Sequence, residues 1–295
     1  MSRNRHDRGG GFFLLLLLGR LQDHGLRDMG YVTLATIAGQ ILLFMGIINP
    51  PWSAGDVCLS GEAILRYKDY SRLFLSAVEH VDEIHLYHNM VSFLLKGKTL
   101  ERKYGSVKFF ILLVLFTLAT SLTYAGLALA ASRHYDDYSY MKQCAIGFSS
   151  VIFALKVLTT YYERSPYSSV FGVAIPSKYA VWAELVIIHI LVPNASFIGH
   201  LAGILVGLAY IYGPLSDVVD AISGTLTSRG PSYGRRSYTY SHGTARGDIS
   251  QVSRPNSPAE AMAMIEEYVA RDITPLPSSP TASLSPPSVS ILSLS

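Results

Sequence analysis

Residues 108–131 read KFFILLVLFTLATSLTYAGLALAA and carry a single charged side chain, Lys108, at their first position. A helix needs about 20 mostly apolar residues to cross the hydrocarbon layer of a bilayer, and this stretch supplies them. Because no water is available in that layer, the backbone must satisfy its own hydrogen bonds, which favours a helix. The stretch therefore predicts a membrane-spanning helix.

Five further apolar stretches surround this one, and together they predict an all-α fold, a bundle of six transmembrane helices. Their ranges are 31–49, 84–97, 144–162, 178–193 and 195–213. The composition agrees, since charged residues make up 15% of the chain, against about 25% in soluble domains. A transmembrane β-barrel would need alternating segments of about ten residues, which are absent. We therefore expect a membrane domain over residues 31–213.

The two ends of the chain differ from this domain. Residues 1–30 are expected to be a cytosolic segment with a short apolar patch, Phe12–Leu18, at the membrane interface. A signal peptide is the alternative, but no small-residue cleavage site follows the patch. Residues 214–295 are predicted to be a mostly disordered tail. Because lysine and arginine concentrate in the N-terminal segment and in the loops after the second and fourth spans, both termini are expected in the cytosol.

One part of the tail has a helical pattern. Ser257 and Glu260 form a capping box, and an apolar stripe follows at helical spacing. This pattern predicts a short amphipathic helix over residues 257–271. Without a domain to pack on, such a helix would dock a partner or form only transiently.

Four polar residues lie near the same end of three predicted spans: His85 and Asn89 in the second, Ser149 in the fourth and His200 in the sixth. In the predicted orientation these spans all run inward from the non-cytosolic face. Asn89, Ser149 and His200 then lie about 8 Å deep, at about 1.5 Å per residue. Polar groups within a membrane are costly and usually face a bundle interior or a wet cavity. The common depth predicts one shared cavity, open to the non-cytosolic side.

These residue types suit nucleophilic catalysis. The hydroxyl of Ser149 needs a base to become a nucleophile, and the imidazole of His200 titrates near neutral pH. His85 and Asn89 are spaced i, i+4 on one helix face, and with the backbone N–H of Ser149 they could stabilise an oxyanion. Each residue also has a structural interpretation, because membrane serines often bond their own helix and polar side chains can join helices.

Glycines accompany these residues. Gly147 precedes the serine by two positions, and Gly203 and Gly207 follow the histidine with a spacing of four. Small residues at that spacing let two helices approach closely. A reactive serine and its base on different helices require such an approach.

Three motifs together resemble the rhomboid proteases: Gly147–Ser150 (GFSS), His85–Asn89 (HLYHN) and His200–Gly207 (HLAGILVG). The resemblance covers about residues 31–213. It implies that Ser149 is the nucleophile, that His200 is the base and that His85 and Asn89 stabilise the oxyanion. It also implies that Phe153 packs beneath the histidine. Ser150 departs from the family pattern, which has glycine after the nucleophile.

The resemblance further implies a function: an intramembrane serine endopeptidase that acts on transmembrane protein substrates within the lipid bilayer. More narrowly, the chain is similar to the endoplasmic-reticulum rhomboids. That likeness implies an endoplasmic-reticulum membrane protein that cleaves unstable clients for degradation, with ubiquitin or an AAA+ unfoldase as cytosolic partners of the tail. The alternative function is that of a rhomboid-like pseudoprotease, which binds or escorts membrane clients without cleaving them.

Several other partners are not expected. The H-E-x-x-H motif of intramembrane metalloproteases is absent, so we expect neither a metal nor another cofactor, and nothing indicates nucleic acid. The two cysteines, Cys58 and Cys144, fall on the non-cytosolic side in this topology. A disulfide between them and two buried free thiols are both compatible with the sequence.

Overall fold

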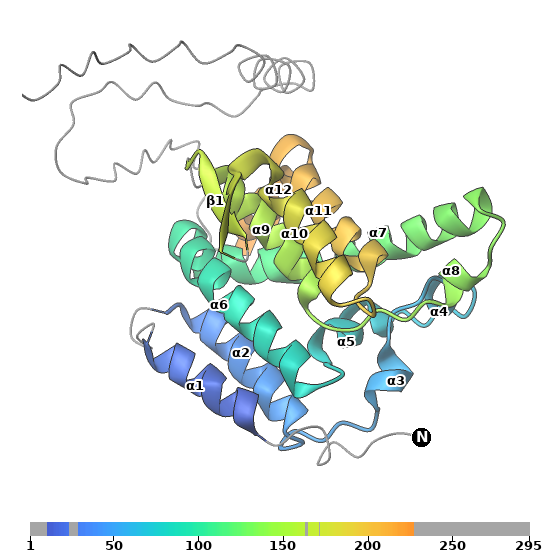
Figure 1. Ribbon diagram of the computed structural model, residues 1–295, viewed down its shortest axis with the longest axis horizontal. Coiled ribbons are helices and arrows are strands. Elements are labelled where there is room, and N and C mark those ends of the chain that lie inside the picture. Colours follow the sequence, from blue (N-terminus) through green and yellow to red (C-terminus); the bar gives the residue numbers. More distant parts are fainter. Residues whose placement is uncertain (1–10, 24–28, 163–164, 171, 227–295) are drawn as a thin grey trace, which may run out of the picture. The chain divides into compact units, whose positions relative to one another are not determined.

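The computed structural model describes residues 11–23, 29–162, 165–170 and 172–226, and over this part the chain is mostly helical (Figure 1). The larger helices are α1 (Phe12–Asp23), α2 (Tyr31–Phe44), α6 (Glu83–Tyr104), α7 (Ser106–His134), α9 (Ser149–Tyr162), α10 (Ser177–Leu191), α11 (Phe197–Tyr212) and α12 (Leu215–Leu226). Short helices occupy the connections: α3 (Ala54–Val57), α4 (Gly61–Leu65), α5 (Arg72–Val78) and α8 (Ser139–Lys142). The predicted helix over 257–271 lies outside the described residues.

Each of the six predicted spans contains a helix, but not all of these helices are long. By length and composition, only α7 among the described helices could cross a membrane alone; α11 and α12 meet the same criterion together, as a pair bent by 72°. Helix α2 is a shorter apolar helix of 14 residues. The fourth predicted span began at residue 144, whereas α9 begins at Ser149, because the preceding residues form an extended segment instead.

Helix α7 lies at the centre of the bundle. It packs against α6, α9 and α11, and its residues Phe109, Leu112 and Phe116 are fully buried. Helices α9 and α11 pack tightly on each other beside it. The apolar core therefore lies between the helices that carry the polar motifs, and it fixes their relative positions.

A buried carboxylate joins three of these helices. Glu101, near the end of α6, accepts hydrogen bonds from the backbone of Val32 (3.0 Å) and Thr33 (2.8 Å) at the start of α2. It also accepts hydrogen bonds from the hydroxyls of Thr33 (2.7 Å) and of Ser106 in the first turn of α7 (2.6 Å). The start of α2 is thereby held at the end of α6, so these two helices run in opposite directions.

The N-terminal apolar run forms a helix within the bundle rather than the expected interfacial patch. Helix α1 packs along α6, and Leu17 is fully buried. The backbone N–H of Leu14 donates to Glu83 (2.9 Å), so the first turn of α1 lies at the start of α6. Leu17 and Leu21 are the buried residues of this helix.

Helical structure also continues past residue 213, where the tail was expected to begin. Helix α12 packs against α7 and α11, with Val219 fully buried. Lys108 of α7 forms an ion pair with Asp220. An amphipathic helix buried on one face, rather than tail, therefore follows α11.

The connection between α9 and α10 contains a small departure from the all-α prediction. Strands β1 (Tyr167–Val170) and β2 (Val173–Pro176) form an antiparallel hairpin in which Val170 pairs with Val173. Helix α10 contacts both strands. The fold is therefore a helical bundle with one two-stranded hairpin.

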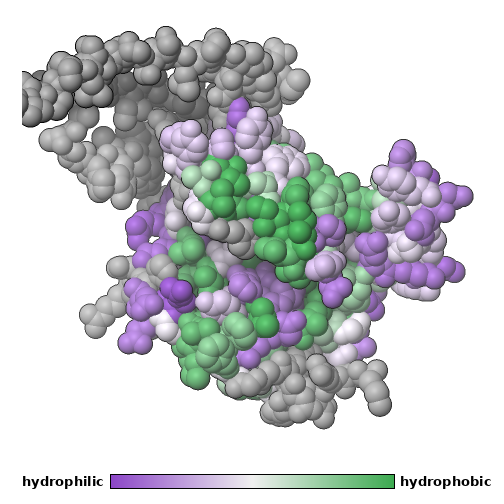
Figure 2. Space-filling view, in the orientation of Figure 1, coloured by the Kyte–Doolittle hydropathy of each residue, from purple (hydrophilic) through white to green (hydrophobic). Residues whose placement is uncertain are grey.

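Helix α10 presents apolar side chains to its surroundings. Trp182, Val186, Ile190 and Leu191 are exposed, and Figure 2 shows apolar surface over the region of α10 and α11. Hydrophilic residues gather instead around α8 (Figure 2). Large exposed apolar surfaces mark contacts with membranes or other proteins.

Candidate active site

Ser149 is the first residue of α9, and the turn before it depends on glycine. Gly147 has a φ of 108°, a conformation that side chains rarely adopt. A Cβ atom at this position would also lie 2.6 Å from Cε1 of His85. The N–H of Gly147 donates to the carbonyl of Ser76 in α5 (2.8 Å). Gly147 therefore lets the chain turn into α9 directly against the His85 ring.

The structure brings Ser149 and His200 together. The Nε2 atom of His200 lies 3.0 Å from the Oγ atom of Ser149, within hydrogen-bonding distance. His200 is in the first turn of α11, which Ser196 caps by accepting the N–H of Gly199 (3.1 Å). The ring of Phe153 stacks on the His200 ring, with centroids 4.5 Å apart and planes at 26°. Phe153 thereby fixes the orientation of the imidazole.

The two glycines after His200 allow this approach. A Cβ atom on Gly203 would lie 2.1 Å from the carbonyl oxygen of Ser150, and one on Gly207 would lie 2.7 Å from Cβ of Val157. Ordinary van der Waals contact begins at 3.4 Å. Helices α9 and α11 are therefore as close as they are only because these positions lack side chains.

His85 and Asn89 lie on α6, and they differ in how directly they reach the serine. His85 contacts Gly147, as described above, and its ring meets that of His80 edge to face at 5.1 Å. The side-chain amide of Asn89 donates to the carbonyl of His85 (2.8 Å), so one of its two hydrogens is used within its own helix. The predicted oxyanion role of Asn89 would depend on the other hydrogen.

An ion pair lies between α9 and α10. Lys156, two turns below Ser149, pairs with Glu184, and both side chains are largely buried. Their pairing with each other gives both charges a structural role, because a buried charge needs an opposite one.

Sequence reasoning missed other residues near the site. A cavity of about 440 Å³ is lined by residues from the end of α10, the α10–α11 loop and the segment before α9, among them His189, Asn194, Ser196 and Cys144. The ring of His189 contacts that of Phe197 at 5.3 Å. Sequence alone offered a signal for His189, which is another histidine at the end of a predicted span.

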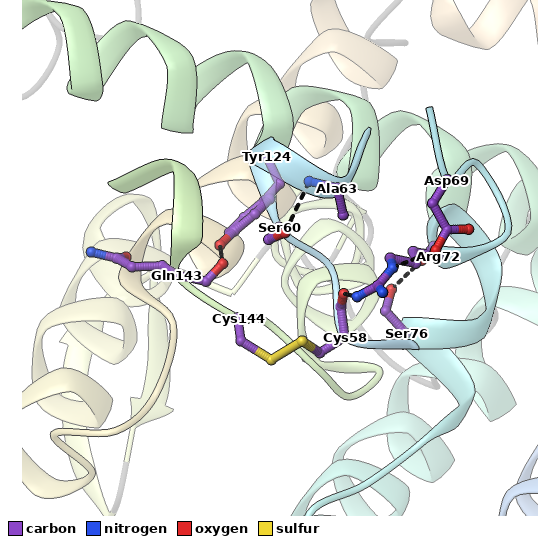
Figure 3. Close-up of a disulfide and its surroundings, with 9 residues drawn as sticks. All are labelled: Cys58, Ser60, Ala63, Asp69, Arg72, Ser76, Tyr124, Gln143 and Cys144. Carbon is purple, nitrogen blue, oxygen red and sulfur yellow. Dashed lines mark hydrogen bonds and ion pairs between the residues drawn. A yellow bond between two sulfur atoms is a disulfide. The ribbon is translucent and has the colours of Figure 1, made fainter. Parts of the chain in front are cut away.

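Cys58 and Cys144 form a disulfide, with Cα atoms 5.5 Å apart. Figure 3 shows it beside Arg72, whose guanidinium donates to the carbonyl of Cys58 (2.8 Å) and to Asp69 (2.7 Å). Hydrogen bonds from the Ser71 hydroxyl and from Arg72 lower the pKa of Asp69 below its ordinary value. Of the two alternatives that the sequence left open, the structure therefore has the disulfide and not two free thiols. The disulfide ties the first loop to the segment that leads into α9.

Among the residues that the structure describes, no group of three or more histidine, cysteine, aspartate or glutamate side chains is placed to hold a metal ion. The site itself supplies a hydroxyl, two imidazoles and backbone N–H groups, which together can activate and stabilise an acyl transfer.

Comparisons with known proteins agree on one family. The family model described as the rhomboid domain matches residues 67–216, a range that contains the whole site. Rhomboid-related protein 4 of Homo sapiens is 39% identical over 267 residues, which cover 90% of this chain and 84% of the relative. Rhomboid-related protein 4 of Mus musculus is 42% identical over 229 residues, 77% of this chain and 72% of the relative.

A plant protein extends the comparison. Rhomboid-like protein 14, mitochondrial, of Arabidopsis thaliana is 40% identical over 210 residues, 69% of this chain and 62% of the relative. No solved structure shows a significant match. Since the family model covers half of the chain and the human and mouse relatives align over most of it, the chain belongs to the rhomboid family of integral membrane proteins.

Proposed function

We propose that this chain is a serine endopeptidase that cleaves membrane proteins within or beside their transmembrane segments. The observation that carries the proposal is the 3.0 Å separation of Ser149 Oγ and His200 Nε2. A serine and a histidine in that geometry form a nucleophile and its general base. The ring of Phe153 against His200 supports the same role, because a base must be held in one orientation.

The reaction proceeds in two halves. In the first, Nε2 of His200 takes the proton from Ser149 as Oγ attacks the substrate carbonyl carbon. The negative charge on the carbonyl oxygen is stabilised by the backbone N–H of Ser149 and by His85, with the free hydrogen of Asn89 as a further donor. The peptide C–N bond then breaks, and the leaving amine takes the proton from His200. In the second half, a water molecule takes the place of Ser149 as the nucleophile, and the same steps release the acyl group from Ser149.

We place this site in a domain of six membrane spans formed by α2, α6, α7, α9, α10 and α11. Helix α10 has 15 residues and would extend about 22 Å, less than the roughly 30 Å of a typical hydrocarbon core. The domain would thin the surrounding bilayer to match its helices. The exposed apolar side chains of α10 support lateral entry of a substrate helix between α6 and α10.

Co-expression with a model type I membrane substrate tests the proposal. We expect wild-type protein to generate a substrate fragment and the Ser149→Ala variant, at equal expression, to generate none. Undiminished cleavage by Ser149→Ala would refute the assignment of the nucleophile. A substrate with a leucine-rich, unbroken transmembrane helix is the matched control, because such a helix resists the unwinding that cleavage requires.

A pseudoprotease that binds clients without cutting them is the second candidate. Ser150 supports it, since the family pattern has glycine there. A Cβ atom on Gly199 would lie 3.2 Å from the Ser150 hydroxyl, so this side chain fills space between α9 and α11. For this candidate, wild type and Ser149→Ala would co-purify equally with a client, and neither would produce a fragment.

The cellular role is proposed on the likeness to Rhomboid-related protein 4. We propose that the chain resides in the endoplasmic-reticulum membrane and cleaves unstable clients, and that residues 257–271 bind ubiquitin or an unfoldase. Deleting these residues should abolish partner binding and leave proteolysis intact. Because the plant relative is named as mitochondrial, imaging of the tagged chain against markers of both organelles tests the location; a mitochondrial signal would overturn it.

A further inference from the structure

The Cys58–Cys144 disulfide lies five residues before the nucleophile, and the proposed mechanism does not use it. The whole chain contains two cysteines, so this is the one disulfide that a single chain can form. It joins the segment before α4 to the segment before α9, which are 86 residues apart in the sequence. Its position raises the question of what it holds in place.

A continuous series of contacts leads from the disulfide to Ser149. Next to it, Leu59 and Ala145 exchange two backbone hydrogen bonds of 2.8 Å in an antiparallel bridge. Two residues further, the N–H of Gly147 donates to the carbonyl of Ser76, also at 2.8 Å. The His85 ring lies against Gly147. Ser149 follows Gly147 by two residues.

The first loop braces this series from the other side. Arg72 donates to the carbonyl of Cys58, and Tyr124 of α7 donates its hydroxyl to the carbonyl of Gln143 (2.9 Å) (Figure 3). Leu59 and Ala145 also pack in a small buried apolar cluster with Leu73 and Ala202. Each hydrogen bond contributes only about 1 kcal/mol. An isolated bridge of two residues is not stable by itself. The disulfide adds a covalent link between the two segments beside these weaker contacts.

We propose that the Cys58–Cys144 disulfide positions Ser149 for attack, so that its reduction slows proteolysis; the inference rests on the proposed protease function. The reductant is a dithiol. Its thiolate attacks one sulfur of the disulfide, the S–S bond breaks, and the second thiol closes the reductant into its own disulfide. Two electrons and two protons pass to the chain, which then carries free thiols at positions 58 and 144.

The disulfide is accessible to such a reagent. Cys144 is exposed, Cys58 is half-buried, and Cys144 lines the cavity described above. Both cysteines would face an oxidising compartment in the proposed topology, where the bond persists. Activity would then depend on the redox state of the compartment that the site faces.

The test compares wild type with the Cys58→Ala/Cys144→Ala double variant in proteoliposomes containing a fluorescent transmembrane substrate. Each protein is measured oxidised, after a small dithiol, and after re-oxidation. We expect reduction to lower kcat of wild type about tenfold, as a small misplacement of a reacting group does, with KM unchanged. The double variant should have the lowered kcat from the start and should not respond to the dithiol, because it has no cysteine.

The outcomes separate the two proposals. Equal kcat for oxidised and reduced wild type, with reduction verified by thiol alkylation and mass spectrometry, would overturn the positioning role alone. So would a dithiol effect of the same size on the double variant, since that effect could not come from the disulfide. A decrease in kcat that re-oxidation does not reverse would also overturn the positioning role. No cleavage by oxidised wild type would instead refute the proposed function.

Discussion

Gly203→Ala is the substitution for which the structure makes the sharpest prediction. The added Cβ atom would lie 2.1 Å from the carbonyl oxygen of Ser150, more than 1 Å inside the 3.4 Å at which ordinary contact begins. The backbone of α9 cannot yield as a flexible side chain would, so α9 and α11 must separate by about 1 Å. His200 precedes Gly203 by one helical turn, and Ser150 follows Ser149 directly.

The separation therefore acts on the reacting pair itself. The 3.0 Å between Ser149 Oγ and His200 Nε2 would lengthen to about 4 Å, which is beyond a hydrogen bond. A displacement of about 1 Å in a catalytic group can cost about a hundredfold in rate. We expect Gly203→Ala to lower kcat for a fluorescent transmembrane substrate in proteoliposomes by about that factor, while the helical circular-dichroism spectrum is retained.

Two further glycines provide a graded control. Gly126, in α7, has nothing within 4 Å of the Cβ position, so Gly126→Ala should keep full activity. Gly199→Ala would meet the hydroxyls of Ser196 and Ser150, at 3.1 and 3.2 Å, and Cβ of Ser196 at 3.3 Å, which are milder contacts, and it should have an intermediate effect. Wild-type kcat in Gly203→Ala, or a loss in Gly126→Ala as large as in Gly203→Ala, would show that close packing at Gly203 does not hold Ser149 and His200 together.

Three other predictions concern the surroundings of the site. Phe153→Leu keeps the packing but removes the stack on His200, and should lower kcat about threefold to tenfold; an unchanged kcat would contradict it. Glu101→Gln removes the charge that accepts the Thr33 hydrogen bonds and should lower the unfolding free energy in detergent by about 2 kcal/mol, which an unshifted unfolding midpoint would disprove. Glu184→Gln should destabilise the protein by about 3 kcal/mol, and Glu184→Leu with Lys156→Met should recover most of that loss; equal stability of both variants would count against a structural ion pair.

Much of the site's arrangement could be anticipated because its residues occupy equivalent places on parallel helices. Ser149 and His200 both lie near the same ends of spans that are predicted to run in one direction, so the sequence places them at a common depth. The structure has them 3.0 Å apart, while their catalytic roles stay predictions. The spacing of Gly203 and Gly207 likewise predicted close packing of α9 and α11, which the structure has.

The features that sequence reasoning missed depend on contacts between distant segments. The bridge between Leu59 and Ala145 has no periodic pattern, and it turns the expected start of the fourth span into extended chain. The apolar run of α1 is too short to reveal whether it lies on a membrane or against another helix. The amphipathic pattern of α12 was hidden because the serine- and glycine-rich composition of the tail begins within it.

The proposed protease depends on Ser149 as a nucleophile that His200 activates. Labelling of the purified chain in detergent with a fluorophosphonate, followed by peptide mass spectrometry, tests this pairing. We expect a covalent adduct on Ser149 in wild type and none at that residue in His200→Ala. An adduct on Ser150 instead, or equal labelling of Ser149 with and without the histidine, would contradict it.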